Sequence, residues 1–119
     1  MDTYEIWVNL APGVRDLDFV ASVRAYLGYL KNQGKIESFR IRRRKLGFSP
    51  DGLGEWNVSI EINNLAQLDQ AFLRVAARDP EIEGLHANVF SKVVDFKSGL
   101  YRDFPDSVRS IPSPLKGEG

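Results

Sequence analysis

Hydrophobic and polar residues alternate along four segments of the chain, and such alternation is typical of strands that bury one face. The segments cover residues 4–10, 36–46, 55–62 and about 85–93. The clearest of them places four apolar side chains on one face, namely Trp56, Val58, Ile60 and Ile62. The pattern therefore predicts four half-buried strands.

Two other segments repeat apolar residues every three or four positions, which is the spacing of an amphipathic helix. The first begins at Asp16 or Asp18 and runs to about Asn32. The second begins after Asn64, a favourable N-cap residue, and ends near Pro80. Each predicted helix has one apolar stripe, so each packs one side against a core.

The predicted order is strand, helix, strand, strand, helix, strand. This order indicates an α+β, ferredoxin-like βαββαβ fold, in which two helices cover one face of a four-stranded antiparallel sheet. Right-handed crossovers give the strand order 4-1-3-2. We expect one domain over residues 1–104, with a packed C-terminal extension from about residue 95 and a flexible tail over 105–119.

The composition argues against nucleic-acid and membrane partners. Lys and Arg together number 16 and so do Asp and Glu, which gives a formal net charge of zero. There is no Cys and the only His is His86, so we expect neither a metal site nor a cofactor. The N-terminal residues lack a basic region and a long apolar run, so we expect a cytoplasmic protein.

The second face of the predicted sheet is left uncovered, because both helices pack on the first. Strand parity predicts that it presents Trp7, Asn9, Arg40, Arg42, Asn57, Ser59, Glu61, His86, Asn88 and Phe90. Polar groups of this kind must face water, a ligand or one another, since burial without partners is costly. The mixture of aromatic rings, amides and charges therefore indicates a wet pocket or a polar interface.

This arrangement of strands, helices and an uncovered sheet face resembles the dimeric α/β-barrel superfamily over residues 1 to about 104, and most of all its uncharacterised small bacterial members. The resemblance implies a homodimer in which two sheets face each other and enclose a barrel. Haem-degrading members use an Asn on the first strand, a Trp and a helical His. Asn9 fits the first of these, but Trp56 is on the predicted core face and His86 is in the predicted last strand, which argues against haem chemistry.

Two hypotheses for function follow. In the first, the barrel binds a small aromatic or anionic molecule, or performs cofactor-independent chemistry on it. Trp7 and Phe90 would contact the molecule, and Arg40 or Arg42 would meet a negative group. His86 is the candidate general acid or base, but we favour a hydrogen-bonded His at a subunit interface or in water, because the spacing fixes no catalytic partner. Whether the protein is an enzyme stays open at this point.

In the second hypothesis the same residues form the interface of a structural or regulatory dimer without a ligand. An RNA-binding domain with the same element order is a further alternative. That class needs stacking aromatic rings on the central strands, where this sequence has Asn57, Ser59 and Glu61. The sequence therefore disfavours RNA binding.

Overall fold

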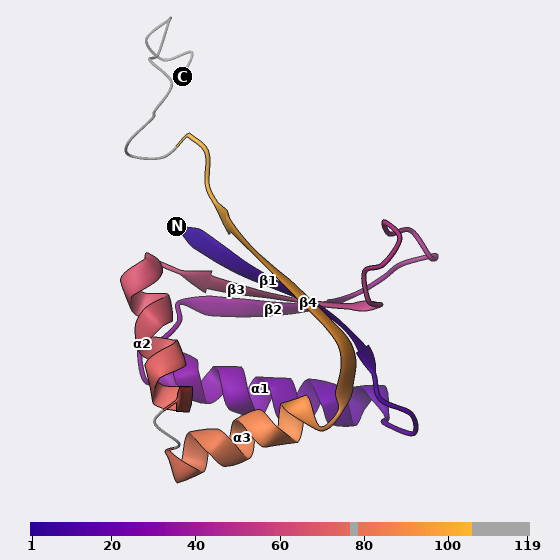
Figure 1. Cartoon of the computed structure of the whole chain (residues 1–119), viewed down its shortest axis with the longest axis horizontal. Helices are drawn as coiled ribbons and strands as arrows, with labels where there is room; N and C mark the ends of the chain where they lie inside the picture. The colour runs from indigo at the N-terminus through magenta and orange to yellow at the C-terminus, as the bar shows by residue number, and fades with distance from the viewer. Residues whose placement is uncertain (77–78, 106–119) are drawn as a thin grey trace, which may run out of the picture.

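Four antiparallel strands form the sheet of this protein (Figure 1). The computed structural model describes residues 1–76 and 79–105. The strands are β1 (Asp2–Leu10), β2 (Ser38–Arg43), β3 (Trp56–Ile62) and β4 (Val93–Arg102). Their order in the sheet is β2-β3-β1-β4, which is the predicted order read from the opposite edge. The predicted ferredoxin-like sheet is therefore confirmed.

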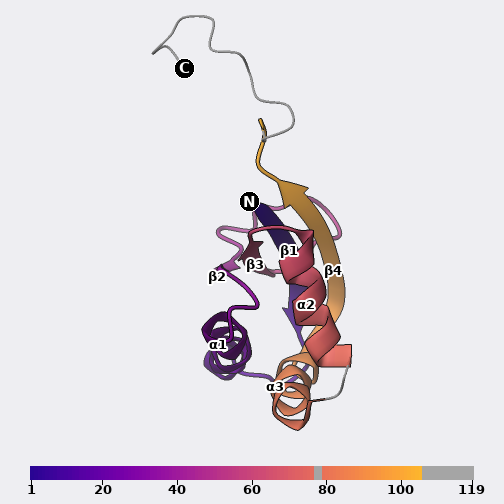
Figure 2. The same cartoon turned by 90° about the vertical axis from the view of Figure 1, so that its left-hand side faces the viewer.

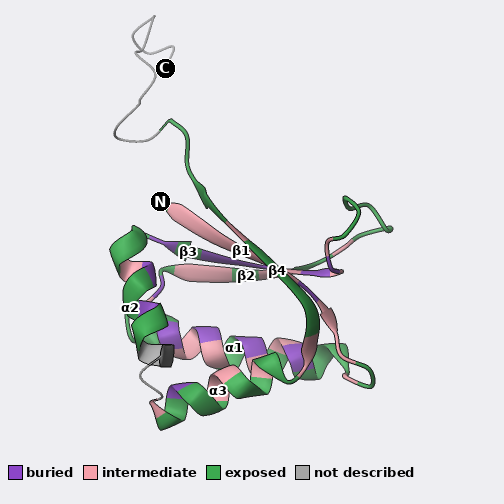
Figure 3. Ribbon diagram, in the orientation of Figure 1, coloured by how far each residue is buried: buried purple, intermediate pink, exposed green. Residues whose placement is uncertain are grey.

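Three helices cover one face of this sheet and leave the other face open (Figure 2). They are α1 (Asp16–Asn32), α2 (Leu65–Ala76) and α3 (Pro80–Phe90). The core lies between the two layers, and the buried stripe of α1 faces the sheet (Figure 3). The most buried large side chains of the core are Phe19, Ile62 and Ile82. No helix within the described ranges has the length and hydropathy needed to cross a membrane.

The start of α2 is fixed by Asn64, the predicted N-cap residue, together with Gln67. The backbone N–H of Gln67 donates to Asn64 Oδ1 at 3.0 Å, and Gln67 Oε1 accepts from the backbone N–H of Asn63 at 2.7 Å. These bonds satisfy N–H groups that have no partner within the first turn of a helix. The predicted cap is confirmed.

The predicted last strand over residues 85–93 is wrong, because residues 80–90 form α3 and β4 begins only at Val93. The side chain of Asp79 accepts from the backbone N–H groups of Glu81 and Ile82, and Pro80 occupies the first turn. This is a helix start, since Pro lacks only an N–H that would be unpaired there. The segment after it also has helical spacing, with apolar or aromatic side chains at Ile82, Leu85, His86, Val89 and Phe90. Short apolar segments satisfy both periods, so alternation alone misassigned this one.

The segment that the sequence analysis treated as an extension from about residue 95 is therefore the fourth strand. Strand β4 pairs with β1 at the edge of the sheet, where Leu100 lies opposite Tyr4 and Lys97 lies opposite Trp7. The predicted flexible tail falls almost entirely on residues 106–119, outside the described part of the chain.

The connection between β2 and β3 is tied to the rest of the sheet at its base. Gly54 lies so close to β1 that a Cβ atom there would come within 2.3 Å of the Val8 carbonyl oxygen. Lys97 of β4 donates to the carbonyl oxygen of Gly52 at 2.6 Å. The connection between β2 and β3 is thus held by β1 and by β4. The close approach to β1 leaves no room for a side chain at residue 54, which is why glycine occupies it.

We expect Gly54→Ala to lower the free energy of unfolding by about 1–3 kcal/mol, because the added methyl group forces β1 and the connection apart. Gly28→Ala is the matched control, since a Cβ at Gly28 meets no atom within 4 Å. That change in α1 is expected to stabilise the protein by about 0.5–1 kcal/mol. Urea unfolding of both variants measures the difference, and equal stabilities would refute the close approach at Gly54.

Candidate functional site

The open face of the sheet brings together seven of the predicted site residues. The central strands contribute Trp7 and Asn9 from β1 and Asn57, Ser59 and Glu61 from β3, while Arg40 and Arg42 come from the edge strand β2. The register places Trp7, Asn57 and Arg42 in one row across the sheet, and Glu5, Ser59 and Arg40 in the next. Their common location is as predicted, and a role in ligand binding stays a prediction.

The other three predicted site residues do not lie on this face. His86, Asn88 and Phe90 belong to α3, and His86 and Phe90 line a space on the helical side of the sheet. Asn88 is exposed, and its carbonyl oxygen accepts from Ser91 and Lys92. The predicted location of these three residues on the open face is therefore wrong, because α3 lies on the opposite side of the sheet.

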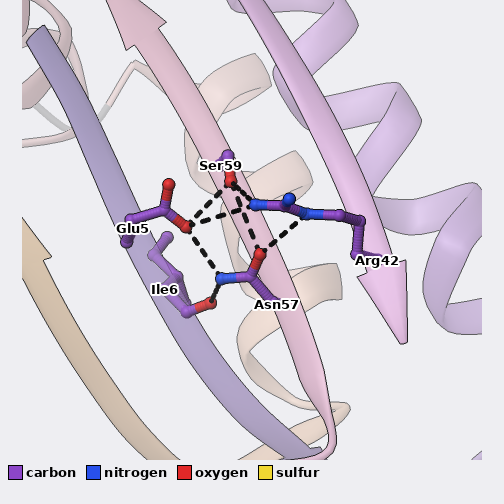
Figure 4. A network of polar contacts seen from close by, with 5 residues as sticks. All are labelled: Glu5, Ile6, Arg42, Asn57 and Ser59. Atoms are coloured by element: carbon purple, nitrogen blue, oxygen red, sulfur yellow. Dashed lines mark hydrogen bonds and ion pairs between the residues drawn. The ribbon is translucent and has the colours of Figure 1, made fainter. Parts of the chain in front are cut away.

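A closed network of hydrogen bonds occupies the middle of the open face (Figure 4). Glu5 Oε1 accepts from Asn57 Nδ2 and from Ser59 Oγ, each at 2.8 Å. Arg42 donates to Ser59 Oγ at 2.9 Å and to Asn57 Oδ1 at 3.2 Å. The Glu5 side chain is only 16% exposed, so these partners hold a half-buried carboxylate. Asn57 and Ser59 thus satisfy their neighbours and are not free to orient a ligand.

Asn9 also has a structural role. Its Oδ1 accepts from the backbone N–H of Glu55 at 2.9 Å, and its Nδ2 donates to Asp95 Oδ2 at 3.0 Å. Asn9 therefore joins β1 to β4 and to the residue that precedes β3. Sequence reasoning missed this partnership, because Asp95 was assigned to an extension rather than to a strand of the same sheet.

A polar groove of about 360 Å³ runs along the open face near β2. Its lining consists of Thr3, Glu5, Ser38, Phe39, Arg40, Arg42, Ser59 and Glu61. Glu61 accepts from Ser38 Oγ at 2.5 Å, so part of this lining is also paired internally. Within the described ranges, no group of three or more His, Asp or Glu side chains is placed to hold a metal ion. The groove therefore offers charges of both signs, but no metal site.

An apolar cavity of about 310 Å³ lies on the opposite side, between the sheet and the helices. Five of the elements around it contribute an aromatic ring, namely Tyr4 from β1, Tyr26 from α1, Phe72 from α2, His86 and Phe90 from α3 and Phe96 from β4. Four of these rings form a row in which each ring contacts the next. The centroid distances are 5.5 Å from Tyr26 to His86, 4.6 Å from His86 to Phe90 and 6.1 Å from Phe90 to Phe96. Such a wall suits a flat molecule.

Three of these rings also form the rim of the cavity. Phe72, Phe90 and Phe96 are 50%, 52% and 44% exposed although each lines the cavity. One side of each ring therefore meets solvent and the other meets the interior. The spacing of Tyr4, Tyr26 and Phe72 along the sequence is that of core positions, and nothing in it distinguishes a filled core from a hollow one.

The polar atoms of the cavity lie in surroundings that disfavour charge. Burial raises the pKa of Tyr26 to about 12, and the nearby Tyr4 adds to this effect. Burial also lowers the pKa of His86 from its ordinary value of 6.5. Both groups are therefore uncharged at neutral pH. The imidazole then offers one N–H donor and one nitrogen acceptor.

The sequence matches the family of unknown function DUF6614 over residues 1–113. The chain belongs to this family. No curated protein matches this sequence.

Several solved structures share the fold. Residues covering 90% of this chain align with 99% of At3g17210 from Arabidopsis thaliana, at 9% identity and a TM-score of 0.68. A dimeric ferredoxin-like protein of unknown function from Jannaschia sp. CCS1 matches at 14% identity and a TM-score of 0.59, over 87% of this chain and 100% of the other. A second such protein, from Thermobifida fusca, matches at 14% identity and a TM-score of 0.56, over 86% of this chain and 90% of the other. At these identities the likeness shows the fold and no specific function.

His86 makes stability depend on pH in a defined direction. Its pKa is lower in the folded protein than the ordinary value of 6.5, so the unfolded chain binds this proton more readily. The free energy of unfolding should therefore fall as the pH is lowered from about 7.5 to about 5.5. Over this range the pH passes the ordinary pKa of 6.5 and approaches the lower pKa of the folded protein. His86→Phe keeps a ring against Tyr26 and Phe90 but does not titrate.

Urea unfolding at pH 7.5 and pH 5.5 tests this expectation, because His86 is the only His in the chain. The wild-type protein should lose more stability between the two pH values than His86→Phe does. Equal losses in the two proteins would show that His86 is not desolvated in the fold.

Proposed function

We propose that this protein binds a small aromatic molecule in the cavity between the sheet and the helices. The observation that supports it is a space of about 310 Å³ into which β1, α1, α2, α3 and β4 all present aromatic rings. This volume is at the lower end of ligand sites, which typically span about 300–1,000 Å³. An apolar cavity of about 150 Å³ is enough to bind benzene, so a molecule of two fused rings is a reasonable occupant.

An unfilled cavity of this size is unfavourable for a protein without a ligand. Side chains around an empty space lose dispersion contacts on one side, and the free energy of unfolding falls with the volume left open. A flat ligand restores these contacts against Tyr26, Phe90 and Phe96 and enters past the half-exposed rim. The cavity is thus a better candidate site than the open face, where Asn9, Asn57 and Ser59 already have partners.

The same proposal assigns the open face to a homodimer interface. Two of the similar structures are described as dimeric. The face is not covered by helices and combines the aromatic Trp7 and Tyr101 with charges of both signs. These features suit pairing with a second copy, in which Arg40 of one copy meets Glu61 of the other. A cytoplasmic dimer remains our expectation for the working form.

Filling the cavity should abolish binding without unfolding the protein. Ala71 of α2 is buried and lines the cavity, so the side chain of Ala71→Leu takes the ligand's place. The control is Ala66→Leu on the same helix, where the side chain is exposed. A ligand at about 100 times its dissociation constant adds about 2.7 kcal/mol to the free energy of unfolding.

Thermal melts with indole, naphthalene and related one- and two-ring molecules measure this effect. At least one of them should raise the Tm of the wild-type protein and of Ala66→Leu by several degrees. The Ala71→Leu protein should melt cooperatively and show no such shift. The proposal fails if no aromatic probe shifts the wild-type Tm, or if Ala71→Leu responds as the wild type does.

The dimer interface makes a separate prediction. Trp7 lies in the middle of the open face, so a Lys ammonium there would be desolvated on pairing. We expect Trp7→Lys to raise the dimer dissociation constant at least tenfold, as measured by analytical ultracentrifugation. Phe48→Lys is the matched control, since Phe48 is 82% exposed on the connection between β2 and β3. A folded Trp7→Lys protein that dimerises like Phe48→Lys would exclude the open face as the interface.

A further inference from the structure

Three polar groups of the cavity have no partner in the described part of the chain. Tyr4, Tyr26 and His86 line the cavity, and neither the two hydroxyl groups nor the imidazole nitrogens form a hydrogen bond with a described residue. Half-buried polar groups usually find a partner in the protein, in water or in a ligand. These three lie close together, since Tyr26 contacts His86 and interacts electrostatically with Tyr4. They are therefore the polar side chains of an otherwise apolar lining.

The cavity offers nothing to balance a charged ligand. No Lys, Arg, Asp or Glu side chain is among the residues that line it. The arginines that the sequence analysis assigned to a negative group lie across the sheet, on the open face. The environment also raises the pKa of Tyr26 and lowers that of His86, so it penalises a negative charge and a positive charge alike. A carboxylate or a phosphate would enter without a counter-charge.

We propose that the ligand is an uncharged aromatic molecule with a hydroxyl group, and that Tyr26 and His86 hold this hydroxyl. This inference rests on the proposed function and specifies the chemical class of its ligand. An aromatic hydroxyl both donates and accepts a hydrogen bond. The unprotonated nitrogen of His86 accepts a hydrogen bond from the O–H of the ligand, and the hydroxyl of Tyr26 donates a hydrogen bond to the ligand's oxygen.

The arrangement of the rings fits such a molecule. Tyr26 and His86 meet edge to face at 70°, so their rings form two walls of the same corner. Phe90 and Phe96, stacked at 27°, continue the wall toward the rim and leave flat surfaces for the ligand's own rings. The hydroxyl end of the ligand thus lies inside, and its apolar end lies near the rim.

Three probes with the same ring system test the inference at pH 7.5: 2-naphthol, naphthalene and 2-naphthoate. Their dissociation constants are measured by NMR titration of the full chain. We expect 2-naphthol to bind about fivefold more tightly than naphthalene, the gain from one net hydrogen bond. The anionic 2-naphthoate should bind at least tenfold more weakly than 2-naphthol. Tyr26→Phe and His86→Phe should each bring the ratio of the naphthalene to the 2-naphthol dissociation constant close to one.

Tyr101→Phe is the control, because it removes a hydroxyl from the open face and should alter none of the three constants. The outcomes separate the two claims. If naphthalene binds but 2-naphthoate binds as tightly as 2-naphthol, or if neither Phe variant changes the preference for the hydroxyl, the ligand class is wrong and the cavity is still a binding site. If none of the three probes binds, the proposed function itself is refuted.

Discussion

The position of β1 in the middle of the sheet is the constraint on which the remaining structure depends. It pairs with β3 on one side and β4 on the other, so the register fixes which side chains meet the helices. Tyr4, Ile6 and Val8 line the cavity, whereas Glu5 and Trp7 lie on the open face. A shift by one residue would bring the Glu5 carboxylate beneath the helices and Ile6 into solvent. Two separate regions follow from this alternation, one apolar and hollow, the other polar and internally bonded.

The two regions differ in which polar groups they leave without a hydrogen-bond partner among the described residues, and this difference supports the roles that we propose for them. On the open face, Asn57 and Ser59 together hold the carboxylate of Glu5, and Asn9 ties β1 to its neighbours. These groups give the face a fixed shape, which suits pairing with another protein surface. In the cavity, Tyr26 and His86 have no hydrogen-bond partner among the described residues. A ligand therefore gains more from the cavity, where it satisfies groups that the described residues leave unpaired.

The sequence was sufficient for the sheet and insufficient for the site. The alternation of β1 and β3 identified the open face correctly, because long strands with one buried side have an unambiguous period. The segment after Pro80 satisfied both periods, and the Asp79-Pro80 helix start was overlooked, so His86 and Phe90 were assigned to the wrong side of the sheet. The cavity was beyond sequence reasoning altogether, since a ring at a core position looks the same whether its neighbours fill the space or leave it open.

Backbone amide chemical shifts report most directly which side of the sheet receives the ligand. In a titration of the isotope-labelled protein with 2-naphthol, the account predicts changes confined to residues around the cavity, with Tyr26, Ala71, His86 and Val93 among the most affected. The amides of Arg42, Asn57 and Ser59 should not move. Changes centred on those three residues instead, with the α1 and α3 amides unaffected, would contradict the account, because they would locate the site on the face that the structure shows to be internally satisfied.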